Sequence, residues 1–274
     1  MTYSSQAQRC FFSVVLAVLL FAGIARGQAT KSEFEPRVGQ AGKDVVWVPT
    51  PQALVDMMLE MAKATPSDYL MDLGSGDGRT VITAAKRGIR AHGIEYNSDM
   101  VELSKRNAAK EGVSDKATFA KADLFESDFS QATVITMFLL PEINLKLRPR
   151  LLNLKPGTRI VSNTFTMGEW GPDETAAVDQ DCFSWCNALL WIVPAKVEGS
   201  WKLADGELTL KQSYQMLTGS LKTASGTTQL TGRLRGEQIT LNGGGKEYGG
   251  RVNVNAISGA QAGGGNWSAT RVKP

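Results

Sequence analysis

Apolar runs and amphipathic stretches alternate along the chain between residues 50 and 162. The pattern predicts strands at 69–71, 91–95, 117–121, 133–140 and 158–162, and helices starting at Pro51 and covering 80–87, 98–111 and 145–154. Thr50 is the expected N-cap of the first helix. Strands that alternate with helices are typical of an α/β domain whose doubly wound, mostly parallel sheet is covered on both faces. We assign residues 45–194 to this domain.

The pattern changes after Pro194, where helical periodicity ends and alternating segments begin. Expected strands are 207–214, 229–234, 238–241 and 251–257, with turns at Gly219, Gly226, Gly232, Gly236 and 243–245. Residues 195–274 are therefore predicted to form a small antiparallel β domain. Trp201 and Trp267 are expected to fill the inside of a small barrel or sandwich. The sequence indicates no chemistry for this domain.

Residues 1–27 have the pattern of a signal peptide or membrane anchor. Arg9 precedes an uncharged run at 11–25, and the small residues Ala25 and Gly27 follow. The run of about 15 apolar residues is short, because a spanning helix needs about 20. We therefore expect export to the periplasm or medium. The alternative is an uncleaved anchor: basic residues after the run would then keep the large domain in the cytoplasm. Residues 28–44 are expected to be a linker.

A glycine-rich turn follows the strand predicted at 69–71. The sequence is Asp72-Leu73-Gly74-Ser75-Gly76-Asp77-Gly78-Arg79, and a predicted helix begins directly after it. Glycines permit a tight turn that brings the backbone close to a ligand at the helix N-terminus. Asp72, Gly74, Ser75, Gly76 and Gly78 are therefore candidate cofactor-binding residues.

Two further acids end the next two predicted strands. Glu95 lies where a carboxylate accepts hydrogen bonds from ribose hydroxyls, and Asp123 lies where an acid accepts from an adenine amino group. The glycine spacing differs from the G-x-G-x-x-G of dinucleotide sites, and Asp72 would repel a pyrophosphate. An acid at this place suits a ligand that carries an ammonium and a sulfonium. The expected cofactor is S-adenosyl-L-methionine.

These motifs resemble the class I, seven-strand S-adenosylmethionine-dependent methyltransferases. Together with Val48-Pro49-Thr50-Pro51, Leu139-Leu140-Pro141-Glu142 and 154–159, they are similar to a bacterial branch related to the lysine methyltransferases that act on the ATP synthase c-subunit and on the adenine nucleotide translocase. The resemblance covers about residues 45–194. It implies a Rossmann-like methyltransferase fold and protein-lysine N-methylation, with a protein acceptor that could be a membrane protein. Small-molecule or lipid methylation, or a degenerate domain that binds without catalysis, are the alternatives.

The resemblance also points to acceptor-side residues. Pro141 would shape the opening for the acceptor nitrogen, and Glu142 would either attract an amine or cap the following helix. The chain departs from relatives in two places. Many amino-methylating relatives carry Asn or Asp beside the proline, where this chain has Leu139-Leu140-Pro141. Bacterial relatives often have His and Asp in place of Asn163 and Thr166. Because in-line methyl transfer depends on alignment and dehydration, a dedicated base is not required.

Charge and cysteine usage exclude several other classes. The net charge of +3 comes from scattered basic residues, which disfavours nucleic acid as a partner. The single His and three Cys argue against a Cys/His metal site, and we predict no metal. Cys182 and Cys186 are interpreted as two separate thiols: in a strand they would lie about 13 Å apart, although a helical turn would let them meet.

Overall fold

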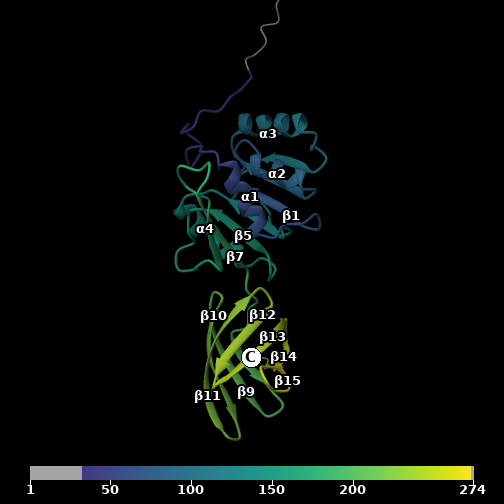
Figure 1. Cartoon of the computed structure of the whole chain (residues 1–274), viewed down its shortest axis with the longest axis vertical. Coiled ribbons are helices and arrows are strands. Elements are labelled where there is room, and N and C mark those ends of the chain that lie inside the picture. The colour runs from purple at the N-terminus through teal and green to yellow at the C-terminus, as the bar shows by residue number, and fades with distance from the viewer. Residues whose placement is uncertain (1–32, 273–274) are drawn as a thin grey trace, which may run out of the picture. The chain divides into compact units, whose positions relative to one another are not determined.

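The computed structural model describes residues 33–272, so the proposed signal or anchor at 1–27 lies outside the described residues. Residues from Phe34 onward form a unit that contains a seven-strand sheet and a closed eight-strand barrel (Figure 1). Within 33–272, no helix combines the length and the apolar character needed to cross a membrane.

The seven-strand sheet has the order β3-β2-β1-β4-β5-β7-β6. Its strands are β1 (Tyr69–Leu73), β2 (Arg90–Glu95), β3 (Ala117–Lys121), β4 (Val134–Met137), β5 (Arg159–Asn163), β6 (Glu174–Ala177) and β7 (Asn187–Ile192). The first five are parallel to one another, while β7 runs antiparallel to both β5 and β6. The predicted parallel α/β fold is confirmed. The pattern predicted neither β6, whose residues are largely exposed, nor the mostly buried β7.

Alternating side chains in the central strands build two cores, one on each face of the sheet. Leu70 and Val134 join the core that packs beneath α1 (Gln52–Met61), α2 (Arg79–Lys86) and α3 (Ser98–Lys110). Their neighbours Met71 and Ile135 point to the other face, where α4 (Pro141–Leu151) covers them. Helices therefore cover both faces of the sheet.

Two helix starts differ from the predictions. The N-cap of α1 is Pro51 rather than Thr50, and no side chain caps the helix. The Thr50 hydroxyl instead accepts a hydrogen bond from the Asn163 amide at 3.3 Å. Helix α4 begins at Pro141 rather than at Leu145, because proline suits the first turn of a helix, where its missing N–H is not needed.

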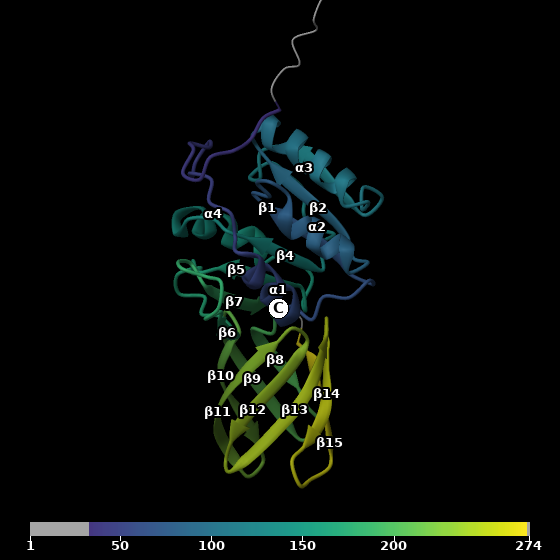
Figure 2. The ribbon, with the colours of Figure 1, turned by 45° about the horizontal axis from the view of Figure 1, so that its top comes forward.

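The eight C-terminal strands close into an antiparallel barrel (Figure 2). They are β8 (Gly199–Lys202), β9 (Gly206–Ser213), β10 (Met216–Thr223), β11 (Gly226–Arg235), β12 (Gln238–Gly243), β13 (Lys246–Asn253), β14 (Ala256–Gln261) and β15 (Asn266–Arg271). Trp201 is fully buried in the barrel core, and Trp267 packs against that core, as expected. The strand predicted at 251–257 is wrong, because the chain turns between β13 and β14.

Gly219 and Gly232 lie inside β10 and β11, so their prediction as turns is also wrong. A Cβ atom on Gly219 would lie 2.1 Å from the carbonyl oxygen of Thr209 on β9, and one on Gly232 would lie 2.3 Å from that of Thr240 on β12. These glycines therefore permit close approach of neighbouring barrel strands.

We predict that Gly219→Ala destabilises the barrel. The added methyl group collides with backbone rather than with a flexible side chain, and such overpacking costs about 1–3 kcal/mol. Gly265→Ala is the matched control, because its Cβ would have no atom within 4 Å. Thermal unfolding followed by circular dichroism should show a lower Tm for Gly219→Ala alone. Equal Tm values for the two variants would contradict the prediction.

Candidate functional site

The carboxyl ends of the parallel strands open into a cavity of about 230 Å³. Its walls include most of the predicted cofactor residues, namely Asp72, Gly74, Ser75, Gly76, Glu95 and Asp123. Ligands of open α/β sheets bind at this edge. Gly78 does not line the cavity; it immediately precedes α2 and adopts the left-handed conformation, with φ of 82°.

Close packing explains the glycines of the turn at 74–78. Gly76 has a φ of 54°, and a Cβ atom there would lie 2.7 Å from the indole nitrogen of Trp47. A Cβ atom on Gly78 would lie 2.8 Å from both Phe119 and Ser104. These two positions therefore admit neither the conformation nor the volume of a larger residue, and Gly74, Ser75 and Gly76 line the cavity.

Glu95, at the end of β2, holds the turn in place. Its carboxylate accepts hydrogen bonds from the backbone N–H groups of Gly76 and Asn97, each at 2.9 Å. Each carboxylate oxygen has a second lone pair, so Glu95 retains acceptor capacity toward the cavity. The same side chain thus positions the turn and presents an acceptor to a ligand.

Asp72, the fourth residue of β1, is a buried acid with a single side-chain donor. The Thr136 hydroxyl on β4 donates to its Oδ1 at 2.7 Å. Burial raises the pKa of Asp72 to about 7, and the charges of Glu95 and Asp77 act in the same direction, against the Thr136 hydrogen bond. A cationic ligand group beside Asp72 would favour the ionised carboxylate.

Asp123 follows β3 and binds a lysine from the N-terminal side. Residues 39–47, here called the strap, form a short turn stabilised by backbone hydrogen bonds between Gly39, Gln40 and Trp47. Lys43 of the strap donates to Asp123 Oδ2 at 2.5 Å and lies 4.6 Å from the centre of the Tyr96 ring. This hydrogen bond holds the pKa of Asp123 below its usual range. The strap includes part of the segment expected to be a linker, and it lines the cavity.

The structure does not bring Pro141 and Glu142 into the cavity wall. Pro141 is the first residue of α4, and Glu142 is exposed in the first turn without a side-chain capping bond. The preceding residues Phe138, Leu139 and Leu140 line the cavity instead. The catalytic roles suggested for Pro141 and Glu142 remain predictions that this geometry does not support.

Several cavity residues carry no recognisable signal in the sequence. Trp47 and Lys43 come from a polar segment before the first helix, and Phe165 and Trp185 come from loops next to β5 and β7. Thr136, which does not line the cavity but binds Asp72, was detectable in principle because it is a polar residue within the apolar strand β4. Its hydrogen bond to Asp72 depends on how β1 and β4 are aligned, because Asp72 and Thr136 are paired positions of these two strands.

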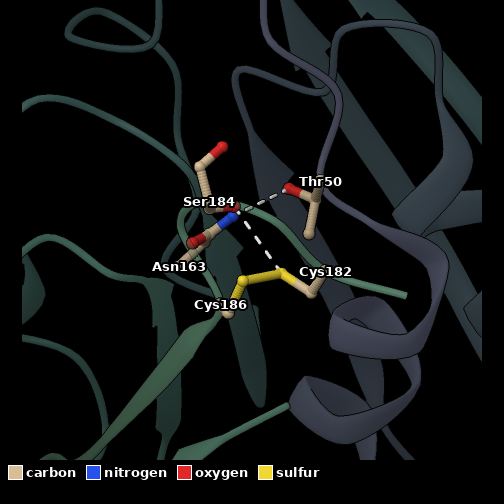
Figure 3. The surroundings of a disulfide bond; sticks show 5 residues. All are labelled: Thr50, Asn163, Cys182, Ser184 and Cys186. Atoms are coloured by element: carbon tan, nitrogen blue, oxygen red, sulfur yellow. Dashed lines mark hydrogen bonds between the residues drawn. A yellow bond between two sulfur atoms is a disulfide. The ribbon is translucent and has the colours of Figure 1, made fainter. Parts of the chain in front are cut away.

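Cys182 and Cys186 form a disulfide, so their interpretation as separate thiols is wrong. The segment is a loop rather than a strand: Asp181 and Trp185 both have φ of 55°, which folds the chain back on itself. The two Cα atoms are consequently 5.8 Å apart. The disulfide lies beside Asn163 and Thr50, as Figure 3 shows.

Comparisons with known proteins agree with this geometry. The model of the family described as "ANTKMT methyltransferase domain" matches residues 72–174. A protein-lysine N-methyltransferase of Saccharolobus islandicus (strain REY15A) is 46% identical over 138 residues, which are 49% of this chain and 86% of that protein. The chain belongs to the class I S-adenosylmethionine-dependent methyltransferases.

Two further relatives extend the comparison. A solved structure of an RNA methyltransferase from Salinibacter ruber, bound to S-adenosyl-L-homocysteine, is 47% identical with a TM-score of 0.51, covering 55% of this methyltransferase and 96% of that chain. The lysine N-methyltransferase of the ATP synthase c-subunit from Homo sapiens is 35% identical over 128 residues, 46% of this methyltransferase. The match spans about half of the human protein, 54% of its length.

S-adenosylmethionine is the cofactor, and the cavity of this methyltransferase fits it. Asp72 offers a buried carboxylate for the ammonium, and Glu95 offers acceptor positions for the ribose. Ser75 has a buried hydroxyl without a hydrogen-bond partner among the described residues. An adenine amino group that binds Asp123 would replace the Lys43 ammonium there.

We predict that Asp72→Asn stabilises the cofactor-free protein at alkaline pH while weakening its ligand affinity. The pKa of Asp72 is raised from 3.8 to about 7, so between these values the native state binds more protons than the unfolded chain. Stability contributed by this group is therefore complete below about pH 4 and lost as the pH rises through about 7. Asparagine keeps an acceptor for Thr136 but carries no charge.

The measurement is a set of thermal melts from pH 5 to pH 8, with calorimetric titration of S-adenosylhomocysteine. The Tm advantage of Asp72→Asn should increase by a few degrees across that range, and the affinity should fall at least tenfold. A Tm difference that does not depend on pH would contradict the assigned protonation of Asp72.

Proposed function

We propose that this methyltransferase methylates the side-chain nitrogen of lysine in a protein acceptor. The observation that carries the proposal is the 46% identity to a protein-lysine N-methyltransferase over 86% of that relative's length. The human relative, named for lysine methylation of the ATP synthase c-subunit, supports the same acceptor class. The cavity adds a physical argument, because its wall beyond the cofactor turn is apolar and aromatic.

An apolar wall suits a lysine acceptor because the amine must lose its proton before it reacts. From a pKa near 10.4, deprotonation at pH 7 costs about 4.6 kcal/mol. Burial beside Leu139 and Ile143 would lower the pKa of an entering amine by disfavouring its charged form. The bound cofactor supplies a methyl group from its sulfonium, whose positive charge disfavours a neighbouring ammonium further.

One observation favours RNA as a second candidate acceptor, namely the description of the Salinibacter ruber protein as an RNA methyltransferase. RNA-binding surfaces usually cluster Lys and Arg to neutralise phosphates. In this chain the excess of basic over acidic residues is only three, and these residues are scattered. We therefore place the protein acceptor first and retain RNA as an outcome of the test.

The test incubates the purified chain and tritiated S-adenosylmethionine with membrane protein, soluble protein, lipid and total RNA from the organism that makes it. We expect label in protein, recovered as methylated lysine after complete hydrolysis and mass spectrometry. Glu95→Ala should reduce the labelling strongly, because each hydrogen bond to a charged acceptor contributes about 1.5–3 kcal/mol. Label in RNA or lipid instead of protein would contradict the proposal and identify that molecule as the acceptor. Cofactor binding without any methyl transfer would indicate a degenerate domain.

We further propose that the chain is exported, with the alternative of an anchored chain facing the cytoplasm. The uncharged run at 11–25 supports insertion, and the Cys182–Cys186 disulfide supports an oxidising compartment, where such bonds persist. A membrane-protein acceptor would be accessible from either location.

Protease treatment of intact spheroplasts, combined with N-terminal sequencing, tests the location. We expect a mature chain that begins near Gln28 and is digested from outside. A full-length chain that is protected until the spheroplasts are lysed would show that the segment is an anchor and that the methyltransferase faces the cytoplasm.

A further inference from the structure

The cavity continues beyond the part that the cofactor motifs account for. Along the sheet edge, Asp123 follows β3, Glu95 ends β2 and Asp72 lies near the end of β1. The next strands in order are β4, β5 and β7, and the cavity wall there contains Phe138, Phe165 and Trp185. If adenosine lies over β2 and β3 and the methionine part over β1, these three rings border the remaining space.

The three rings form one aromatic cluster. The Phe138 and Phe165 rings are stacked, with centroids 5.8 Å apart and an interplanar angle of 19°. Trp185 tilts by 59° against Phe138 at 6.0 Å. Among residues 33–272, Lys or Arg side chains lie over six other aromatic rings, but none lies over these three.

Trp185 owes its position to a covalently closed loop. Its side chain is 42% exposed, so packing alone holds it weakly. The Cys182–Cys186 bond closes the loop around it, and the backbone N–H of Val178 donates to the carbonyl of Cys186 at 2.9 Å. Asn187, the next residue, accepts from the N–H of Thr164 at 2.7 Å, which joins the loop to the end of β5.

We propose that Phe138, Phe165 and Trp185 form the entrance channel for the acceptor lysine, and that the Cys182–Cys186 disulfide positions Trp185 in it. The inference rests on the proposed function and names the site that recognises the lysine. Ring faces attract an arriving ammonium, and the rings also contact the apolar stem of a lysine side chain. Deeper in the cavity, Leu139 and Ile143 replace water and favour the neutral amine.

A binding experiment tests the channel without turnover. The full chain is labelled with 5-fluorotryptophan and saturated with S-adenosylhomocysteine, and n-butylammonium is titrated as a mimic of the lysine side chain. Trp185→Phe identifies the Trp185 signal in the fluorine NMR spectrum. We expect this signal to shift saturably with n-butylammonium, much less with n-pentanol, and less after reduction of the disulfide. No shift, or equal shifts with the amine and the alcohol, would overturn the proposal.

Kinetics on the labelled acceptor provide the second test. Trp185→Ala should raise the KM for the acceptor at least tenfold and leave the KM for S-adenosylmethionine within twofold, and Trp185→Phe should restore most of the loss. Replacing both cysteines with serine should raise the acceptor KM in the same direction. Met216→Ala, which truncates a half-exposed side chain on the barrel, is the matched control.

The outcomes separate the two proposals. An unchanged acceptor KM in Trp185→Ala overturns the channel and leaves lysine methylation intact. If the wild-type chain methylates no lysine, the proposed function fails, and the n-butylammonium titration still decides whether the rings bind an ammonium.

Discussion

The structure of the site depends on a steric constraint: at Gly76 and Gly78, between β1 and α2, the backbone passes where no side chain fits. Without a side chain at Gly76, Trp47 of the strap closes over the turn, and without one at Gly78, Phe119 and Ser104 approach from the other side. The backbone N–H of Gly76 then donates to the Glu95 carboxylate. This one turn therefore aligns β1 with β2, positions the Glu95 carboxylate beside the cavity and packs against Trp47 of the strap.

Electrostatics explain why a cationic ligand suits this arrangement. Glu95 and Asp77 lie close enough to the buried Asp72 for their charges to raise its pKa. Arg79 forms an ion pair with Asp77 and donates to the carbonyl of Thr50, just before α1. The Arg79 charge is therefore not paired with the Asp72 carboxylate. The Lys43 ammonium binds the remaining acid, Asp123. The ammonium and sulfonium of S-adenosylmethionine complement the acids that the chain itself leaves uncompensated.

Sequence patterns predicted which acids and glycines lie around the cavity, because their positions depend on local rules. A strand, a glycine turn and a helix must be consecutive, and the three acids lie at or near the ends of strands, so spacing alone predicted that Asp72, Glu95 and Asp123 share one cavity. The strap, Thr136 and Trp185 depend on contacts between distant segments, which spacing does not encode. The disulfide was missed for a related reason, because left-handed residues at 181 and 185 bring the two cysteines together. Gly219 and Gly232 were misassigned to turns for the same reason. In the barrel they allow neighbouring strands to approach closely, which depends on contacts between strands.

The part of the cavity proposed for the acceptor lysine, around Phe138, Phe165 and Trp185, has few charged residues. The chemistry of methyl transfer explains why such residues are not required there. Two of the positions expected to depart from relatives, Asn163 and Thr166, do not line the cavity: Asn163 is fully buried and Thr166 is exposed. The other departure, Leu139-Leu140, does line it and makes that part of the wall apolar. Methyl transfer from a sulfonium needs alignment and exclusion of water more than proton transfer by a side chain. A carboxylate near the amine would hold it in the unreactive ammonium form more strongly than the aromatic rings do, and the aliphatic wall favours the neutral amine. The scarcity of titratable groups there is therefore consistent with an active methyltransferase.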